Sequence, residues 1–171
     1  MGNKFDIKCE RCDYSFTANV GHGFRGCGFF ETNPDTGKPY FNEYIKSKKI
    51  LADVNRILNT EKNVHEDEIA YGHRISWRGH GSAQYLCPKC GRFHNNFYFK
   101  LTFTGGTYEP AYFCTKCKSK LLLIDIIEDN DIYEKNRFCT ILSAEQINWR
   151  CPLCDHDKLV IDDNASTLYY D

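Results

Sequence analysis

Apolar and polar residues alternate in the middle of the chain. Between residues 97 and 104, aromatic or aliphatic side chains occupy every second position, with a tyrosine, a lysine and two threonines between them. Successive side chains of a strand point to opposite faces, so this alternation predicts a strand with one buried face. The Gly-Gly pair at 105–106 predicts a turn after it. Further strands are predicted over the short apolar runs at 120–127 and 158–161.

The segment that follows the first forty residues has a helical period. Apolar residues recur three or four positions apart between Phe41 and Leu58, as on the buried face of a helix. We therefore predict one longer helix of about five turns over residues 40–60. Three lysines are predicted on its outer side, namely Lys46, Lys48 and Lys49.

The composition favours sheets over a helical bundle. The chain of 171 residues has 12 Phe and 11 Tyr against one Met, and aromatic residues make up 15% of it. Aromatic side chains favour strands and cover the faces of sheets. The fold class that we predict is therefore α+β, with small antiparallel sheets and one longer helix at about residues 40–60.

A short cysteine unit recurs four times and uses eight of the ten cysteines. The four copies are Cys9-Glu-Arg-Cys12, Cys87-Pro-Lys-Cys90, Cys114-Thr-Lys-Cys117 and Cys151-Pro-Leu-Cys154. A Cys-x-x-Cys turn presents two thiolates to one ion, and Zn²⁺ takes four ligands in a tetrahedron, so the units predict two zinc sites. Pro88 and Gly91 favour the turn of the second unit, because Pro presets φ and Gly tolerates positive φ.

Two groupings of the four units are compatible with two sites. The second and third units are separated by 23 residues that are predicted as strand, turn and strand, so a hairpin would bring them together. The first and fourth units then form the other site, although 138 residues separate them. We prefer this nested grouping because the second and third units satisfy one another locally. Loop length does not decide between the groupings, since each doubling changes the closure free energy by only about 0.6 kcal/mol. The sequential grouping, first with second and third with fourth, stays open.

Zinc is the cofactor that we expect, as two structural ions. Four thiolates close the coordination shell and leave no position for a substrate, so we expect structural sites and assign no catalytic residue. Iron substitutes for zinc in an all-sulfur tetrahedral site and stays an alternative. Redox pairs of the thioredoxin type stand alone between a strand and a helix, a context that these units lack.

Three features outside the units are functional candidates. Residues 71–80 combine imidazole, guanidinium and indole groups, which contact phosphates and stack on bases. The candidate ligand-surface residues there are His73, Arg74, Trp77, Arg78 and His80. Cys27, in a Gly-rich segment beside a histidine and an arginine, is a candidate nucleophile. The alternative for residues 71–80 is a strand with Trp77 in the core, and the alternative for Cys27 is a buried inert thiol. His156 is expected beside a metal site, because the four cysteines suffice as ligands.

Charge and hydropathy exclude some classes of protein. The net charge is −1, which argues against a generally basic nucleic-acid binder, and residues 121–171 are acidic. The first twelve residues lack the apolar stretch of a signal peptide, and the longest aliphatic run, 121–124, is too short to span a bilayer. We therefore expect a cytoplasmic protein with no membrane partner. In that compartment, paired cysteines hold metal more often than they form disulfides.

The cysteine segments resemble the zinc-ribbon superfamily. The likeness is carried by CPKCG at 87–91, FYFKLTF at 97–103 and CTKCK at 114–118. The two ends are also similar to bacterial double zinc-ribbon proteins of uncharacterised activity. Those proteins open with a Cys-x-x-Cys knuckle and a Gly-x-Gly-Phe segment, here 21–24, and close with Cys-Pro-x-Cys, here 151–154. The resemblance implies small antiparallel sheets built on two four-cysteine zinc-ribbon sites, and functions in transcription, translation, RNA processing or protein assembly.

These patterns predict a division of the chain into three parts. Residues 1–30 with 140–171 are expected to form a terminal zinc-ribbon lobe, 31–80 a helical connecting insertion, and 81–139 a central zinc-ribbon lobe. The alternative is one compact unit of the size of a single domain.

Three functions are compatible with the sequence. The first is a non-catalytic binding or adaptor module that acts through protein–protein interaction, and it is the one that we expect, with no small-molecule substrate. The second is a nucleic-acid-binding zinc-ribbon protein that uses residues 71–80 and the lysines at 46, 48 and 49. The third is an enzyme that uses Cys27.

Overall fold

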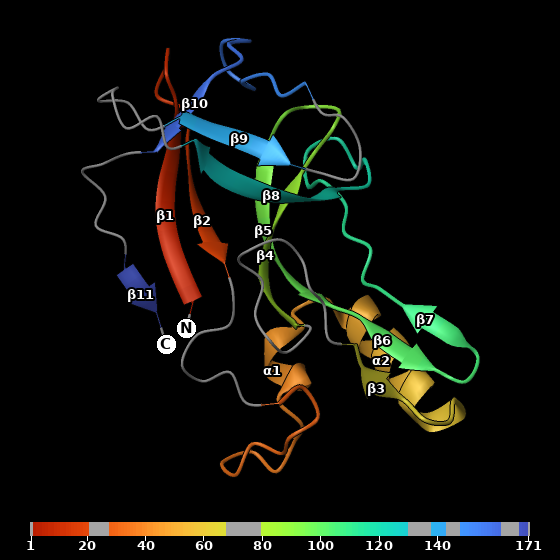
Figure 1. The fold of residues 1–171 in the computed structure, drawn as a ribbon. Helices are drawn as coiled ribbons and strands as arrows, with labels where there is room; N and C mark the ends of the chain where they lie inside the picture. The colour runs from red at the N-terminus through yellow and green to blue at the C-terminus, as the bar shows by residue number, and fades with distance from the viewer. Residues whose placement is uncertain are drawn as a thin grey trace.

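The computed structural model of the chain describes residues 2–20, 28–67, 80–129, 138–142, 148–161 and 168–170. In these residues the strands form one sheet of eight strands and another of three, and the helices lie at the end of the molecule where the small sheet is found (Figure 1). Every strand pair is antiparallel. Antiparallel sheets with few helices agree with the α+β class.

The large sheet combines strands from both ends and from the centre of the chain. Its strands are β1 (Gly2–Cys9), β2 (Ser15–Val20), β4 (His80–Leu86), β5 (Phe93–Phe99), β8 (Leu122–Asp129), β9 (Phe138–Leu142), β10 (Leu159–Ile161) and β11 (Leu168–Tyr170). Their order is β11-β1-β10-β9-β8-β4-β5, and β2 also pairs with β1. The antiparallel β8–β9 pair thus connects the terminal strands to the central hairpin (Figure 1).

The alternating segment at 97–104 is not one strand, as its pattern predicts, but parts of two. β5 ends at Phe99, and β6 (Leu101–Phe103) belongs to the small sheet with β3 (His65–Glu66) and β7 (Gly106–Tyr108). Phe99 and Leu101 are both fully buried, so the alternation of buried faces continues while the chain changes sheets. The turn at 105–106 is confirmed, because it joins β6 to β7 and Gly106 has φ +140°.

The predicted helix covers the right residues but is interrupted. It consists of α1 (Phe41–Tyr44) and α2 (Lys48–Thr60), and the backbone is extended at Ile45 and Ser47. The Ser47 side chain accepts a hydrogen bond from the backbone amide of Ile50, which makes Ser47 the N-cap of α2. The predicted outer lysines at 46, 48 and 49 are exposed.

The apolar stripe of α2 packs on aromatic residues from distant parts of the chain. Val54 is fully buried, and Ile50 and Ile57 lie one turn away from it on the same face. Ile50 and Val54 share a core cluster with other buried residues, namely Phe29, Phe41, Ile45, Phe99 and Leu101. This cluster attaches the helices to the place where the chain leaves the large sheet.

One edge of β2 is closed by side-chain amides instead of by another strand. The Asn95 side chain donates to the carbonyl of Thr17 (2.8 Å) and accepts from the backbone amide of Asn19 (3.1 Å). Gln84 donates to the carbonyl of Asn19 (2.5 Å). Because Gln84 lies on β4 and Asn95 on β5, these bonds fasten the first hairpin of the chain to the central one.

Among the described residues, no helix has the length and apolar character needed to cross a bilayer.

Candidate metal centres

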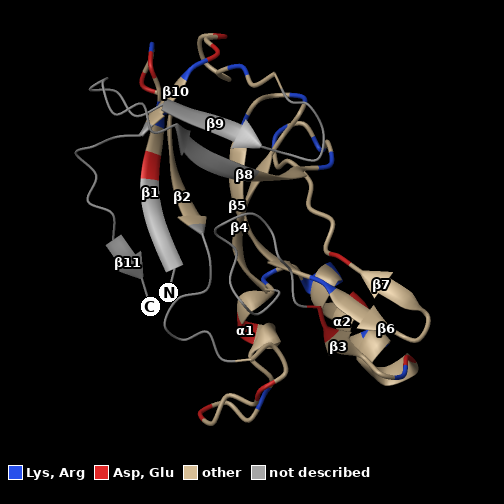
Figure 2. Ribbon diagram, viewed as in Figure 1, with Lys and Arg blue, Asp and Glu red and all other residues tan. Residues whose placement is uncertain are grey.

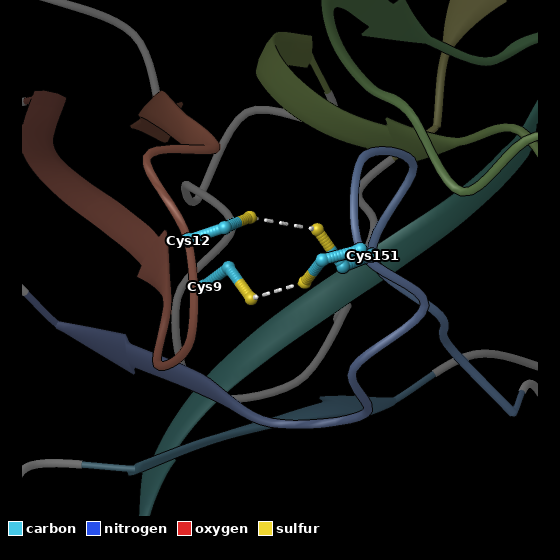
Figure 3. A group of neighbouring side chains, drawn as sticks. Cys9, Cys12 and Cys151 are labelled. Atoms are coloured by element: carbon cyan, nitrogen blue, oxygen red, sulfur yellow. Dashed lines mark hydrogen bonds between the residues drawn. The ribbon is translucent and has the colours of Figure 1, made fainter.

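The terminal cluster consists of Cys9, Cys12, Cys151 and Cys154, and it joins the beginning of the described chain to its last third. The four Sγ atoms lie within 4.8 Å of one another. Figure 3 shows the thiols of two loops facing each other, with 3.6 Å between the Sγ atoms of Cys9 and Cys154 and 3.5 Å between those of Cys12 and Cys151. Cys9 and Cys151 are buried, whereas Cys12 and Cys154 are half-buried.

The central cluster consists of Cys87, Cys90, Cys114 and Cys117 and has the same arrangement. Its Sγ atoms also lie within 4.8 Å of one another, and the first cysteine of each unit is again the buried one. The Sγ separations are 3.2 Å for Cys87–Cys117 and 3.7 Å for Cys90–Cys114. The two clusters correspond to the nested grouping of the four units, and the sequential grouping is excluded.

The sulfur separations identify the kind of site that each cluster can form. A disulfide requires about 2.05 Å between sulfur atoms, so none of these pairs is bonded. In a tetrahedron with metal–sulfur bonds of about 2.3 Å, the sulfur atoms stand about 3.8 Å apart. The observed contacts of 3.2–3.7 Å are near that edge length. Both clusters could therefore hold a metal ion in an all-sulfur shell.

Each unit lies in a six-residue cysteine loop with a common hydrogen-bond pattern. The loops are 9–14, 87–92, 114–119 and 151–156, and in each of them the amide of the first cysteine donates to the carbonyl of the last residue at 2.8–2.9 Å. Three loops are the turns of hairpins, because the residues that flank them are paired: Lys8 with Ser15, Leu86 with Phe93, and Phe113 with Lys120. In these three loops the flanking backbone pair therefore presets the direction in which the two thiols point.

Three of the loops also contain a left-handed residue after the second cysteine. Gly91, Lys118 and Asp155 have φ of +67°, +60° and +62°, and the amide of each donates to the carbonyl of the first cysteine at 3.0 Å. The predicted positive φ of Gly91 is confirmed. For Lys118 and Asp155 the conformation carries a steric cost that glycine avoids.

The thiols of the central cluster ionise very differently. Burial and the contact with Cys117 raise the pKa of Cys87 to about 12. Hydrogen bonds with the side chain and backbone of Ser119 lower the pKa of Cys117 to about 6. Neighbouring thiolates repel one another, so a divalent cation is needed to stabilise all four in the ionised form.

The two clusters are connected through direct contacts. The indole Nε1 of Trp149 donates to the carbonyl of Gly91 at 2.9 Å. A Cβ atom on Gly91 would lie only 2.2 Å from the carbonyl oxygen of Arg150, so the backbones of the two loops approach closely. A hollow of about 290 Å³ lies between the loops and is lined by residues of both, including Pro88, Lys89, Asn148 and Pro152. The terminal cluster is therefore positioned against the central one.

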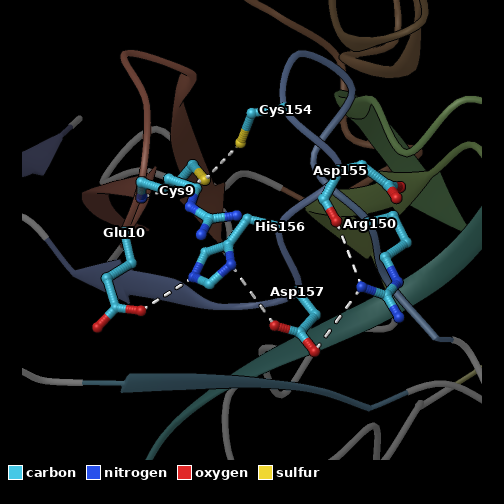
Figure 4. A network of polar contacts seen from close by, with 8 residues as sticks. Cys9, Glu10, Arg150, Cys154, Asp155, His156 and Asp157 are labelled. Carbon is cyan, nitrogen blue, oxygen red and sulfur yellow. Dashed lines mark hydrogen bonds and ion pairs between the residues drawn. The ribbon is translucent and has the colours of Figure 1, made fainter.

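The terminal cluster has polar neighbours that link its two loops. Figure 4 shows His156 beside the sulfur atoms, with its Nε2 3.0 Å from Glu10 and its Nδ1 3.7 Å from Asp157. Arg150 lies 3.9 Å from Asp157 and donates to the carbonyl of Asp155 at 3.3 Å. His156 is therefore a neighbour of the cluster that contacts the opposite loop, and it is not one of the four grouped side chains.

Sequence reasoning did not predict several of these supporting residues. Ser119 stands two positions after a cysteine, and aligning the four units would have identified the loop end that it occupies. The left-handed position of Lys118 and Asp155 corresponds to Gly91 in the same alignment. The contacts of Trp149 and Glu10 are long-range and leave no pattern along the chain.

Most residues of the other candidate sites lie outside the described part of the chain. This holds for His73, Arg74, Trp77, Arg78 and Cys27. His80 is described and is 0% exposed; its Nδ1 contacts Glu66 and its ring stacks on Tyr44. Its imidazole is thus enclosed by protein and is not part of an exposed ligand surface.

Comparisons with protein-family models, with curated proteins and with solved structures find no match to this chain. The likeness to zinc ribbons therefore rests on the cysteine units and on the clusters that they form.

Proposed function

We propose that the protein is a zinc-binding protein in which two structural ions hold a non-catalytic binding platform. One observation carries the proposal: all eight paired cysteines gather into two sets of four, each with its sulfur atoms within 4.8 Å. Four soft thiolates in a tetrahedron suit Zn²⁺ better than hard cations, which prefer oxygen ligands.

A structural role follows from the composition of the clusters. Catalytic zinc keeps an open coordination position and takes histidine or carboxylate ligands. In the described residues, both candidate groups consist of cysteine alone. With all four positions filled by thiolate, the ion would stabilise the fold without contacting a substrate.

A protein partner is the first candidate for what the platform binds. Leu153 lies between Cys151 and Cys154 in the terminal cluster and is 63% exposed. An apolar side chain held outward by a rigid loop is suited to a contact with another protein. We propose on this basis that the protein acts as an adaptor.

The proposal is tested by elemental analysis of the full chain, purified under reducing conditions. We expect about two zinc ions per chain. The double variant Cys12→Ser with Cys154→Ser should retain about one, because it removes ligands of a single cluster. Cys27→Ser with Cys139→Ser is the matched control and should retain both ions. A folded protein without zinc or iron would refute the proposal, and iron in place of zinc would refute its choice of metal.

A nucleic acid is the second candidate partner, favoured by the exposure of the lysines at 46, 48 and 49. Retention on immobilised polynucleotide that falls with salt supports it, because phosphate contacts release counterions. Binding to a protein partner alone, with an affinity that does not change with salt, supports the adaptor role.

A further inference from the structure

The loops of the central cluster carry positive charge that the terminal cluster lacks. Residues 87–92 and 114–120 contain five Lys or Arg and no Asp or Glu. Four of them are exposed lysines, at positions 89, 116, 118 and 120. The loops of the terminal cluster mix both signs, with Glu10, Asp13 and Asp155 beside Arg11. Figure 2 shows Lys and Arg on the central loops and again on α2.

An exposed aromatic ring stands directly beside these lysines. Phe113 is 55% exposed, precedes Cys114 and forms a backbone bridge with Lys120. Most phenylalanines described in the structure are buried or half-buried, so this ring is held outward by its place in the cysteine hairpin. An exposed ring among cations is the arrangement on which nucleic-acid bases stack.

A hollow connects Phe113 to the beginning of α2. It has a volume of about 410 Å³, and its lining includes Lys49, Ile50, Tyr108, Glu109, Tyr112 and Phe113. The Tyr112 hydroxyl donates to the carbonyl of Phe97 at 2.5 Å, which fixes this ring as a wall. Segment 109–113 runs from β7 to the cysteine loops (Figure 1), and its residues line the hollow together with Lys49 at the beginning of α2.

Two acidic residues of the hollow oppose an anionic ligand, but to different extents. Asp53 accepts a hydrogen bond from the Tyr108 hydroxyl at 3.4 Å, so its carboxylate is partly engaged. Glu109 is exposed at the rim. Positive charges stand close by, because Lys49 lines the hollow and follows Lys46 and Lys48 in the chain, while Lys120 is bridged to Phe113 and follows Lys116 and Lys118.

We propose that single-stranded nucleic acid binds along this surface, with a base on Phe113 in the hollow and phosphates on the lysines at 49, 116, 118 and 120. The ring and the hollow favour a nucleic acid over an acidic protein segment, because the side chains of Asp and Glu have no aromatic ring to stack on Phe113. The inference rests on the proposed platform only in that the central cluster holds Phe113 and the lysines in place.

The test measures fluorescence anisotropy of a labelled oligothymidylate of about 12 nucleotides with the zinc-loaded full chain. Phe113→Ser should weaken binding at least about fivefold, since a stacked base contributes about 1–3 kcal/mol. Lys116→Gln with Lys118→Gln should reduce the slope of log affinity against log salt by about 1.4, for two phosphate contacts. Glu109→Gln should strengthen binding, because it removes the opposing charge.

Lys62→Gln is the matched control, since it removes one exposed lysine at the far end of α2 and should leave affinity nearly unchanged. Absence of binding at low salt, or equal weakening by Lys62→Gln and Phe113→Ser, would overturn the inference. Competition by polyglutamate as strong as that by the oligonucleotide would overturn it in favour of an acidic protein. Zinc content is measured on the same samples, so loss of metal would count against the proposed function and a metal-loaded non-binder against this inference.

Discussion

Among individual residues, Gly91 has the most demanding position. It ends the turn of a cysteine loop with φ +67°, and its backbone touches the loop that leads into the other cluster. Both conditions select glycine, the first through backbone conformation and the second through space. Lys118 and Asp155, at the equivalent positions of two other loops, share the left-handed backbone but not the close approach of a neighbouring backbone. A side chain is therefore tolerated at these two positions.

Substitution at Gly91 should therefore be more destabilising than substitution at another left-handed glycine. Gly91→Ala places a Cβ 2.2 Å from the Arg150 carbonyl oxygen, so we expect a loss of about 3 kcal/mol or more in the free energy of unfolding. Gly37→Ala is the control, because Gly37 has the same φ and nothing within 4 Å of an added Cβ. It should lose only about 1 kcal/mol. Urea denaturation of the zinc-loaded variants measures both, and equal losses would show that the close contact is relaxed.

At the scale of elements, β2 is held on its two edges by different chemistry. One edge pairs with β1, and the other is bonded by the side-chain amides of Asn95 and Gln84. Side-chain amides have both a donor and an acceptor, so they satisfy backbone groups that another strand would otherwise pair. The first hairpin is thereby attached to the central hairpin without a continuous ladder between them.

We expect Asn95→Ala to release this edge of β2. The Asn19 amide loses its partner and should exchange with solvent faster, with a loss of about 0.5–1.5 kcal/mol in stability. Asn95→Asp keeps an acceptor for Asn19 but loses the donor to Thr17, so it should preserve protection at Asn19 while still lowering stability. Hydrogen exchange followed by NMR distinguishes the two variants. Unchanged exchange at Asn19 in Asn95→Ala would contradict the role of this amide.

At the scale of the whole molecule, protons would compete with the proposed metal ions for the same thiols. The pKa of Cys87 is raised to about 12, so this thiol must release a proton when zinc binds at neutral pH. Zinc affinity should therefore rise as pH increases and fall as pH decreases. We expect the zinc-loaded protein to lose metal and structure together as the pH falls below neutral.

Circular dichroism and zinc release, followed in one acid titration, measure this linkage. A chelator added at neutral pH should produce the same loss of structure. If the protein released zinc on acidification and kept its full secondary structure, the ions would not be structural.

The sequence predicts the parts of this architecture that depend on local repetition. The cysteine units, the hairpin between the second and third, and the outward lysines of α2 each follow from short spacings. The change of sheet between Phe99 and Leu101 was not predictable, because both strands continue one alternation. The hydrogen bonds of Asn95 and the contact of Gly91 with Arg150 were not predictable either. Contacts with backbone that is distant in the sequence leave no periodic pattern along the chain.

The order of strands also has a consequence for biosynthesis. β1 pairs with β10 and β11, and Cys12 meets Cys151 across 139 residues of chain. At a translation rate of about 5–20 residues per second, roughly 7–28 s pass between the synthesis of Cys12 and that of Cys151. Until then the thiols of Cys9 and Cys12 are open to oxidants and to other metals. A nascent chain that stalls in this interval would expose these two thiols without their partners, so the timing of synthesis would affect which metal ion the terminal cluster could take up.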